Sequence, residues 1–301
     1  MAMPEVVTIT DVALRDGLQN HPHTVPTDVK LDLLARLLAA GVTTLEAGSF
    51  VHPGLVPQMA DADDIFSRLP TAPEASLMAL VPNLRGAERA LAAGVKSVRI
   101  VLSCSEGHSR ANTNRSVSEG IAETRAVVEK LREAGDVRLT GALATVFVCP
   151  FDGIVPVEQV DRVVGALVDM GLNDISLSDT LGKADPAHVE KVVTAMQDRY
   201  PDITFGLHLH NTYGMGLANV LAGLRQGIAQ FDAALGGIGG CPFAPGAAGN
   251  IATEDVVFML QSMGIETGID MVALSLAAAD LQRALGTPLD SAVSRALGWA
   301  A

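Results

Sequence analysis

Two histidines separated by one residue are the clearest chemical signal in this chain of 301 residues. His208 and His210 lie in the segment DITFGLHLHN, with Leu207 and Leu209 at the alternating positions. Side chains two residues apart on a β-strand point to the same face, so both imidazoles would converge while the leucines face an apolar layer. Imidazole is a common metal ligand. The spacing therefore predicts a metal site, with a hydrogen-bonded pair of core histidines as the alternative.

The composition limits the classes of protein to which the chain can belong. Hydrophobic residues make up 49% and charged residues 18%, which predicts a folded protein with a large core. The formal net charge of −13 argues against nonspecific nucleic-acid binding, which needs a basic face. No apolar run approaches the roughly 18 residues that span a bilayer, and no signal peptide pattern opens the chain. We expect a cytoplasmic protein that binds neither nucleic acid nor membrane.

The cysteines agree with that compartment. The chain has three cysteines, Cys104, Cys149 and Cys241. This odd and low number favours a reducing environment over a disulfide scaffold. Cys104 and Cys149 follow apolar runs, and we expect them to be small, buried and inert thiols.

A repeated unit organises the chain: a helical pattern ends in glycine, and a short run rich in Val, Ile and Leu follows. The glycines are Gly41, Gly94, Gly171 and Gly227. Glycine tolerates the left-handed conformation that closes a helix, and uniformly apolar runs are typical of strands covered on both faces. Amphipathic patterns between these units predict helices, for example over 28–40, 119–134, 157–170 and 188–200.

Strands and helices alternate throughout, which favours a parallel sheet. The predicted strands are 6–14, 43–48, 75–81, 97–102, 138–146, 173–178, 204–210 and 229–235. Eight such units in roughly 250 residues predict a (β/α)8 TIM barrel, with a doubly wound open sheet as the alternative. No Gly-x-Gly-x-x-Gly follows the first strand and no Walker-type motif occurs. No linker is visible, so we expect one domain over 1–301, with the barrel at about 6–266 and extra C-terminal helices at about 268–301.

Polar residues gather where the predicted strands end. The first strand leads into Arg15, Asp16 and Gln19, the second contains Glu46, and the sixth ends at Asp179. The active site of a TIM barrel forms at the C-terminal ends of its strands, so these side chains should meet the two histidines. A glycine-rich segment follows the eighth strand, with six glycines and two prolines between Leu235 and Asn250 and Cys241 in its middle. Such a loop can close over a ligand.

These segments resemble a known family. RDGLQN at 15–20, GLHLHN at 206–211 and GGCPFAPGAAGN at 239–250 are similar to 3-hydroxy-3-methylglutaryl-CoA lyases. These enzymes belong to a wider group of metal-dependent carbon–carbon lyases and aldol synthases on (β/α)8 barrels. The similarity runs nearly end to end, and the glycine–cysteine loop is its specific motif because the related synthases lack it.

The resemblance implies a metal-binding set. Asp16, His208 and His210 would hold the divalent cation, and Asn250 would supply an amide oxygen. Asp16 and His208 would also belong to the catalytic residues. Ligand chemistry alone leaves Zn²⁺, Mn²⁺ and Mg²⁺ open, whereas the resemblance favours Mg²⁺ or Mn²⁺.

The resemblance also implies catalytic roles. Arg15 would stabilise an enolate oxygen, Glu46 would lie in the catalytic shell, and Cys241 would transfer a proton from the loop. Gln19 and Asp179 would support the substrate site. Cleavage of a 3-hydroxy-3-methylacyl thioester is a retro-aldol reaction, which needs a polarised hydroxyl, a fixed cation for the enolate and an acid for its carbon.

Some positions depart from the family pattern, and they leave the exact acyl-CoA open. The family usually carries an aromatic residue at the position of His108, an uncharged one at Arg115, and serines after Asp232. We expect cleavage of 3-hydroxy-3-methylglutaryl-CoA, with a related substrate such as citramalyl-CoA and a metal-dependent aldol synthase as alternatives.

Binding of CoA also requires a basic rim on this acidic chain. Arg85, Arg110 and Arg115 are the candidates, because they follow predicted strand ends. The sequence leaves both a monomer and a homo-oligomer open.

Overall fold

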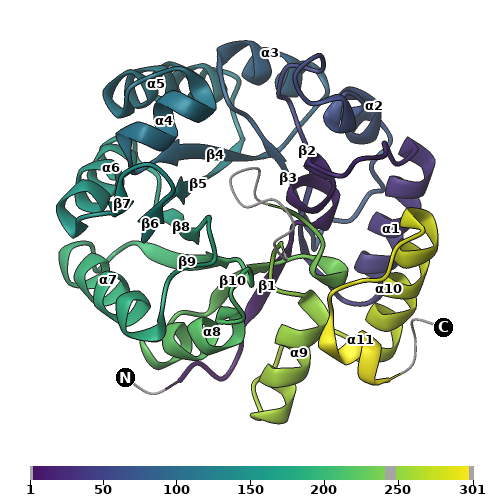
Figure 1. The fold of residues 1–301 in the computed structure, drawn as a ribbon. Helices are drawn as coiled ribbons and strands as arrows, with labels where there is room; N and C mark the ends of the chain where they lie inside the picture. Colours follow the sequence, from purple (N-terminus) through teal and green to yellow (C-terminus); the bar gives the residue numbers. More distant parts are fainter. Residues whose placement is uncertain (1–2, 241–248, 298–301) are drawn as a thin grey trace.

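A closed barrel of parallel strands, surrounded by a ring of helices, forms the centre of the protein (Figure 1). The computed structural model describes residues 3–240 and 249–297. Within them, eight strands close in the order β1-β10-β9-β8-β5-β4-β3-β2. These are β1 (Thr8–Asp11), β2 (Thr44–Ser49), β3 (Ser76–Leu80), β4 (Ser97–Ser103), β5 (Arg138–Ala144), β8 (Asp174–Asp179), β9 (Thr204–Leu209) and β10 (Gln230–Ala233). The predicted TIM barrel is therefore confirmed.

The helices follow the strands as the alternation predicts. They are α1 (Thr27–Ala39), α2 (Ala62–Ser67), α3 (Leu84–Ala92), α4 (Glu106–Thr113), α5 (Val117–Glu133), α6 (Val157–Asp169), α7 (Pro186–Arg199), α8 (Gly216–Arg225), α9 (Thr253–Ser262), α10 (Met271–Leu285) and α11 (Ala292–Ala296). In the part of the chain that the structure describes, no helix is long and apolar enough to cross a membrane.

The glycines that follow the helices have the left-handed conformation that the sequence predicts. Gly41, Gly94, Gly171 and Gly227 all have positive φ angles and follow the ends of α1, α3, α6 and α8. At Gly41, a Cβ atom would also lie only 2.3 Å from the carbonyl oxygen of Gly268, so the turn before β2 packs against the chain that leads into α10. Glycine at this position therefore both ends a helix and allows a close backbone approach.

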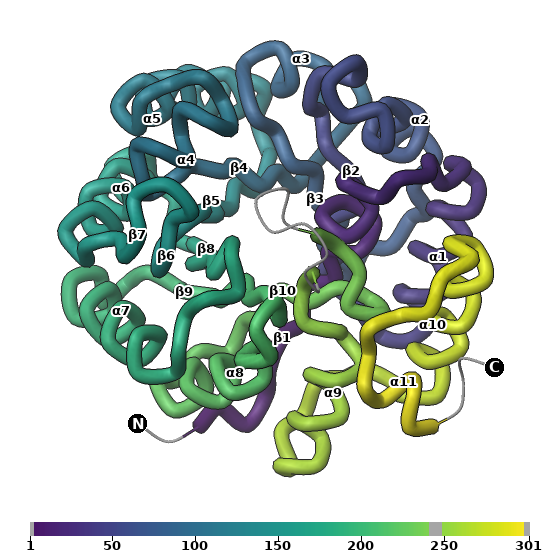
Figure 2. Tube along the Cα trace, in the orientation of Figure 1, coloured from purple at the N-terminus to yellow at the C-terminus, as the bar shows by residue number. Residues whose placement is uncertain are grey.

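The first strand is shorter than predicted. Instead of a strand over 6–14, β1 ends at Asp11 and a single π-helical turn, η1 (Ala13–Gly17), follows. The Asp11 carboxylate accepts a hydrogen bond from the backbone N–H of Ala13 at 2.9 Å, and Gly17 N–H donates to the Val12 carbonyl at 3.1 Å. A local Asp turn thus competes with the strand ladder. Arg15 and Asp16 are presented by this turn, which lies inside the ring of helices in Figure 2.

Two further elements complete the architecture. A hairpin of β6 (Val148–Cys149) and β7 (Gly153–Ile154) follows β5, and its two-residue strands carry too little pattern to be predicted. At the carboxyl end, α10 lies beside α1 (Figures 1 and 2), and Arg36 Nη1 pairs with Asp280 Oδ2 at 2.7 Å. The C-terminal helix α10 therefore packs against α1 on the outside of the barrel.

Candidate active site

Five of the predicted site residues line a cavity of about 450 Å³ at the carboxyl ends of the strands. Arg15, Asp16 and Gln19 line one side of it, and His208 and His210 line another. The register between strands explains part of this convergence, since Ser178 pairs with His208 and His208 pairs with Asp232 across β8, β9 and β10. Side chains in one row of a parallel barrel point to the same interior layer.

The two imidazoles meet as their spacing predicts. Their Nε2 atoms are 3.2 Å apart, and Asp16 Oδ2 lies 3.9 Å from that of His208 and 3.7 Å from that of His210. One ligand atom from each of the three residues lies within 4.8 Å of the others. Leu207 and Leu209 are fully buried on the opposite face. Three potential donors facing one point is the arrangement that a bound cation requires.

Asn250, which follows the last barrel strand, also belongs to this cluster. Its Nδ2 donates to Asp16 Oδ2 at 2.8 Å, and an isolated bridge pairs Asn250 with His210. The residue is buried, yet its Oδ1 has no hydrogen-bond partner among the described residues. A buried amide oxygen without a partner is costly unless a ligand satisfies it. The side chains present therefore fit a divalent cation with mixed nitrogen and oxygen ligands.

The electrostatics keep Asp16 in the form that binds a cation. Burial opposes its ionisation, but the Arg15 guanidinium and the two histidines outweigh this and hold the pKa of the carboxyl well below its usual value. Asp16 is thus a carboxylate throughout the physiological range.

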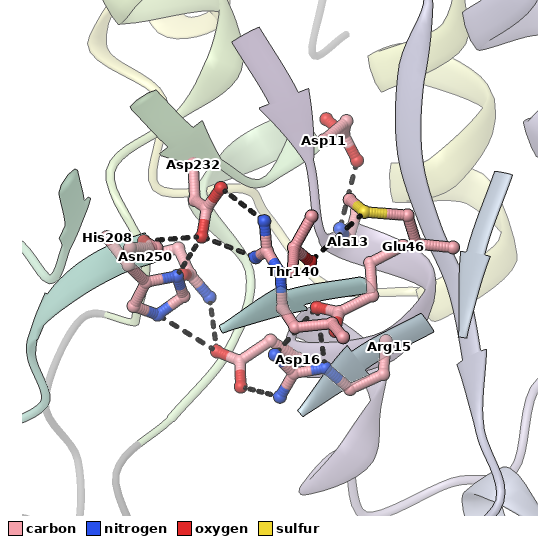
Figure 3. A network of polar contacts seen from close by, with 12 residues as sticks. Asp11, Ala13, Arg15, Asp16, Glu46, Thr140, His208, Asp232 and Asn250 are labelled. Atoms are coloured by element: carbon pink, nitrogen blue, oxygen red, sulfur yellow. Dashed lines mark hydrogen bonds and ion pairs between the residues drawn. The ribbon is translucent and has the colours of Figure 1, made fainter. Parts of the chain in front are cut away.

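Arg15 is clamped between two carboxylates (Figure 3). Its Nε and Nη2 donate to Glu46 Oε2 at 2.8 and 2.7 Å, and its Nη1 pairs with Asp16. Burial alone would lower the pKa of Arg15, but Glu46 and Asp16 outweigh it and raise the pKa above its usual value. Glu46 is fully buried behind Arg15. Glu46 thus holds the Arg15 guanidinium in a fixed position at the cavity wall.

The remaining predicted residues differ in their placement. Gln19 lines the cavity. Asp179 does not: it is fully buried, and its carboxylate accepts backbone hydrogen bonds from Lys183 at 3.1 Å and Ala184 at 2.9 Å. Its position therefore suits the support of the loop after β8 rather than contact with a substrate. Cys241 lies outside the described residues. Cys104 and Cys149 are buried, as expected, and burial raises the pKa of the Cys104 thiol.

Several cavity residues were not predicted. Arg99 on β4 and Asp232 on β10 form a buried ion pair in the floor, and Ser103 and His108 lie in the wall, with Ser103 Oγ 2.7 Å from His108 Nδ1. A charged residue inside an otherwise apolar barrel strand was the signal for Arg99 and Asp232, because both faces of such a strand are covered.

This geometry defines a class of protein: a TIM barrel with a buried Asp/His/His cluster and an arginine at its mouth. The family model described as HMGL-like matches residues 6–281. The chain belongs to this family, and the resemblance read from the sequence is confirmed: its relatives at about 40% identity are carbon–carbon lyases.

Curated relatives match over nearly the whole chain. The (R)-citramalyl-CoA lyase of Chloroflexus aurantiacus is 46% identical, with 97% of this chain and 95% of the relative covered. The hydroxymethylglutaryl-CoA lyase YngG of Bacillus subtilis is 41% identical, with 97% of both chains covered.

Solved structures agree with this assignment. The crystal structure of the Bacillus subtilis HMG-CoA lyase is 40% identical, with a TM-score of 0.96 and coverage of 99% of this chain and 100% of that chain. An HMG-CoA lyase from Acinetobacter baumannii in complex with coenzyme A and 3-methylmalate is 39% identical, with a TM-score of 0.93 and coverage of 98% and 96%.

Proposed function

We propose that the protein cleaves a 3-hydroxy-3-methylacyl-CoA thioester by a retro-aldol reaction, with 3-hydroxy-3-methylglutaryl-CoA as substrate and acetyl-CoA and acetoacetate as products. The observation that carries this proposal is the Asp16, His208 and His210 cluster beside the buried Arg15. The bond cleavage needs two groups. One is a site that polarises the substrate hydroxyl, and the other is a fixed positive charge, here Arg15, beside the thioester carbonyl.

The cluster would hold Mg²⁺ or Mn²⁺ through Asp16, His208 and His210, with the amide of Asn250 as a fourth ligand. When bound, the cation would act as a Lewis acid toward the substrate hydroxyl and orient it. Asp16 and His208 are the residues proposed to be catalytic within this cluster.

The protein residues then account for the movement of electrons and protons. A basic side chain of the Asp16/His208/His210 cluster takes the proton of the C3 hydroxyl. The C2–C3 bond then breaks, so that C3 becomes a carbonyl carbon and the electron pair of the bond enters the thioester enolate. Arg15 faces this enolate oxygen with a charge that Glu46 holds in place. Cys241 is the proposed acid that returns a proton to C2, with Gln19 supporting the substrate in the cavity. We propose that Asp179 acts indirectly, through the loop after β8.

The CoA phosphates would bind at three arginines beside the cluster's cavity, which lie among the carboxylates of Asp63 and Glu123. A second cavity of about 500 Å³ is lined by Arg85, Arg89 and Arg115, and Arg115 also lines the cluster's cavity. Arg110, the third sequence candidate, lines neither of these two cavities. The rim gives an acidic chain a local site for a polyanionic substrate.

Citramalyl-CoA is a second candidate substrate, favoured by the 46% identity with a citramalyl-CoA lyase. Its acyl group is one methylene shorter, and the same bond cleavage yields acetyl-CoA and pyruvate. The wall that contains Ser103 and His108 is where the two acyl groups would be distinguished, since it departs from the family pattern.

A substrate panel tests these alternatives. The purified protein is incubated with each thioester, with Mg²⁺ and after chelation, and acetoacetate, pyruvate and acetyl-CoA are quantified. We expect metal-dependent release of acetoacetate, and faster release of pyruvate would instead assign citramalyl-CoA. No cleavage of any 3-hydroxyacyl-CoA, together with condensation of acetyl-CoA with a 2-oxo acid, would identify an aldol synthase.

A further inference from the structure

A buried ion pair spans the barrel floor directly behind the metal cluster. Arg99 Nη1 and Nη2 donate to the two carboxylate oxygens of Asp232 at 2.6 and 3.2 Å, and the side chains are only 7% and 6% exposed. Removing two charges from water costs several kcal/mol per ion, and replacing such a pair by apolar residues is often neutral or stabilising. Stability alone therefore does not explain this pair.

Asp232 has a further contact that points to function. Its Oδ2 lies 3.1 Å from His208 Nδ1, on the opposite side of the ring from the Nε2 that faces Asp16 and His210 (Figure 3). A carboxylate at this distance accepts the Nδ1 proton. The lone pair of His208 is then left on Nε2, where the cluster needs it.

We propose that Arg99 and Asp232 form a positioning pair, which fixes His208 in the Nδ1-protonated tautomer and so sets its ligand nitrogen toward the metal site. This inference rests on the proposed metal centre. It assigns a role to two residues that lie outside the proposed ligand set.

Arg99 holds the Asp232 carboxylate in place beside His208, with a hydrogen bond to each of its oxygens. The carboxylate also accepts a hydrogen bond from the Ser176 hydroxyl at 3.4 Å. A guanidinium is always charged and holds both oxygens in one plane, so Asp232 keeps the orientation that its contact with His208 requires.

The second histidine, His210, lacks the contact that holds His208. His210 Nδ1 is buried and has no hydrogen-bond partner in the described ranges 3–240 and 249–297. Of the two imidazoles, it is therefore His208 whose Nδ1 a carboxylate contacts. Loss of Asp232 should accordingly change the ring of His208 and leave that of His210 as it is.

Four variants separate this role from general support of the barrel. Arg99→Met and Asp232→Asn each break the pair. The double variant Arg99→Met/Asp232→Leu removes both charges, so no unpaired buried charge opposes folding. Arg138→Met is the control, because it breaks a more exposed Arg–Asp pair of the barrel, with Asp174 at 3.0 Å on the neighbouring strand β8. Arg138 and Asp174 begin β5 and β8, at the end of the barrel away from the cavity.

Two measurements are made on each folded variant: Mn²⁺ affinity by electron paramagnetic resonance, and the tautomer of His208 by ¹⁵N NMR without metal. We expect the three floor variants to bind Mn²⁺ about 10- to 100-fold more weakly and to lose the Nδ1-protonated signal, while Arg138→Met matches the wild type. Wild-type affinity and tautomer in the double variant would overturn the inference, as would equal weakening in Arg138→Met. A wild-type protein that binds no Mn²⁺ would contradict the metal centre itself, and the tautomer measurement distinguishes that failure from failure of the positioning pair.

Discussion

The side-chain amide of Asn250 donates a hydrogen bond to Asp16 across 2.8 Å, although 234 positions separate the two residues in the chain. Asp16 lies in the turn that follows the first strand, whereas Asn250 follows the segment after the last strand. The contact is possible because β1 and β10 are neighbours in the closed barrel. Closure of the barrel therefore brings together proposed metal ligands that follow its first and its last strand.

Asn250→Ala should weaken metal binding while the fold remains intact. The variant loses both the proposed amide ligand and the hydrogen bond to Asp16. Removal of even an outer partner of a metal site costs about 10- to 100-fold in affinity, so we expect at least a tenfold higher Kd for Mn²⁺. Calorimetric titration of the metal-free protein measures this change. An unchanged Kd would exclude Asn250 from the ligand set.

Arg15→Met should lower kcat far more than it changes Mn²⁺ affinity. Removal of a single donor to a developing oxyanion costs about 10²–10³ in kcat, and a full charge should matter at least as much. Arg15→Lys is the control for the fold, since it retains a cation beside the fully buried Glu46. A loss of less than tenfold in the methionine variant would reduce Arg15 to a structural ion-pair partner.

Arg115→Ala should raise the KM for the CoA thioester with little change in kcat. Arg115 lines both the cluster's cavity and the arginine-rich cavity beside it, and its side chain is 40% exposed. An exposed charge contact is worth about 1 kcal/mol or less, which corresponds to an increase in KM of up to about fivefold. Arg110→Ala is the matched control. Equal effects of both substitutions would point to overall charge rather than to a binding rim.

The sequence predicted the barrel and the histidine pair because each depends on a local pattern. Glycine after each helix marked the start of the next strand, and the alternation at 207–210 fixed which side chains face inward. The π-helical turn after Asp11 was not predicted, because its apolar residues also fit the continuation of a strand.

The floor of the site required long-range information. Arg99 and Asp232 lie 133 positions apart, and no local spacing indicates that β4 and β10 direct them at each other across the barrel interior. Asp179 was predicted from its position at a strand end, but its carboxylate turns to the backbone of its own loop. Strand ends thus predict where polar side chains gather, whereas the direction of each one depends on its neighbours.

Cys241 should be the thiol whose modification abolishes activity. It lies outside the described residues, and its role rests on the glycine–cysteine loop motif. Cys104 and Cys149 are buried at 0% and 2% exposure, so both should react slowly with a thiol reagent. We expect mass spectrometry to find Cys241 labelled first, with activity lost in parallel.

Cys241→Ser should lower turnover strongly and leave Mn²⁺ affinity unchanged, because the proposed thiol transfers a proton and does not bind the metal. Cys149→Ser is the matched control. Normal turnover in a Cys241→Ala variant would remove this residue from the mechanism.

Glu254 makes the stability of the protein depend on pH. The residue is fully buried at the start of α9, where its Oε2 accepts from Gly236 N–H at 2.8 Å and its Oε1 contacts Ser294 Oγ at 3.0 Å. Burial outweighs these hydrogen bonds and raises its pKa from 4.5 to about 7. The protonated form is therefore favoured by folding. As pH rises from 4.5 to 7, the unfolded chain releases this proton first, so stability falls across that window and is constant above it.

Glu254→Gln should remove this part of the pH dependence. The amide is neutral at every pH, and it can accept from Gly236 while it donates to Ser294. We expect the free energy of unfolding of the variant, relative to the wild type, to increase between pH 4.5 and 7 by an amount on the order of 3 kcal/mol. Urea unfolding at a series of pH values measures the difference, and the exposed Glu129→Gln on α5 is the control. A difference that stays constant from pH 4.5 to 8 would show that Glu254 ionises as readily in the folded protein as in the unfolded chain.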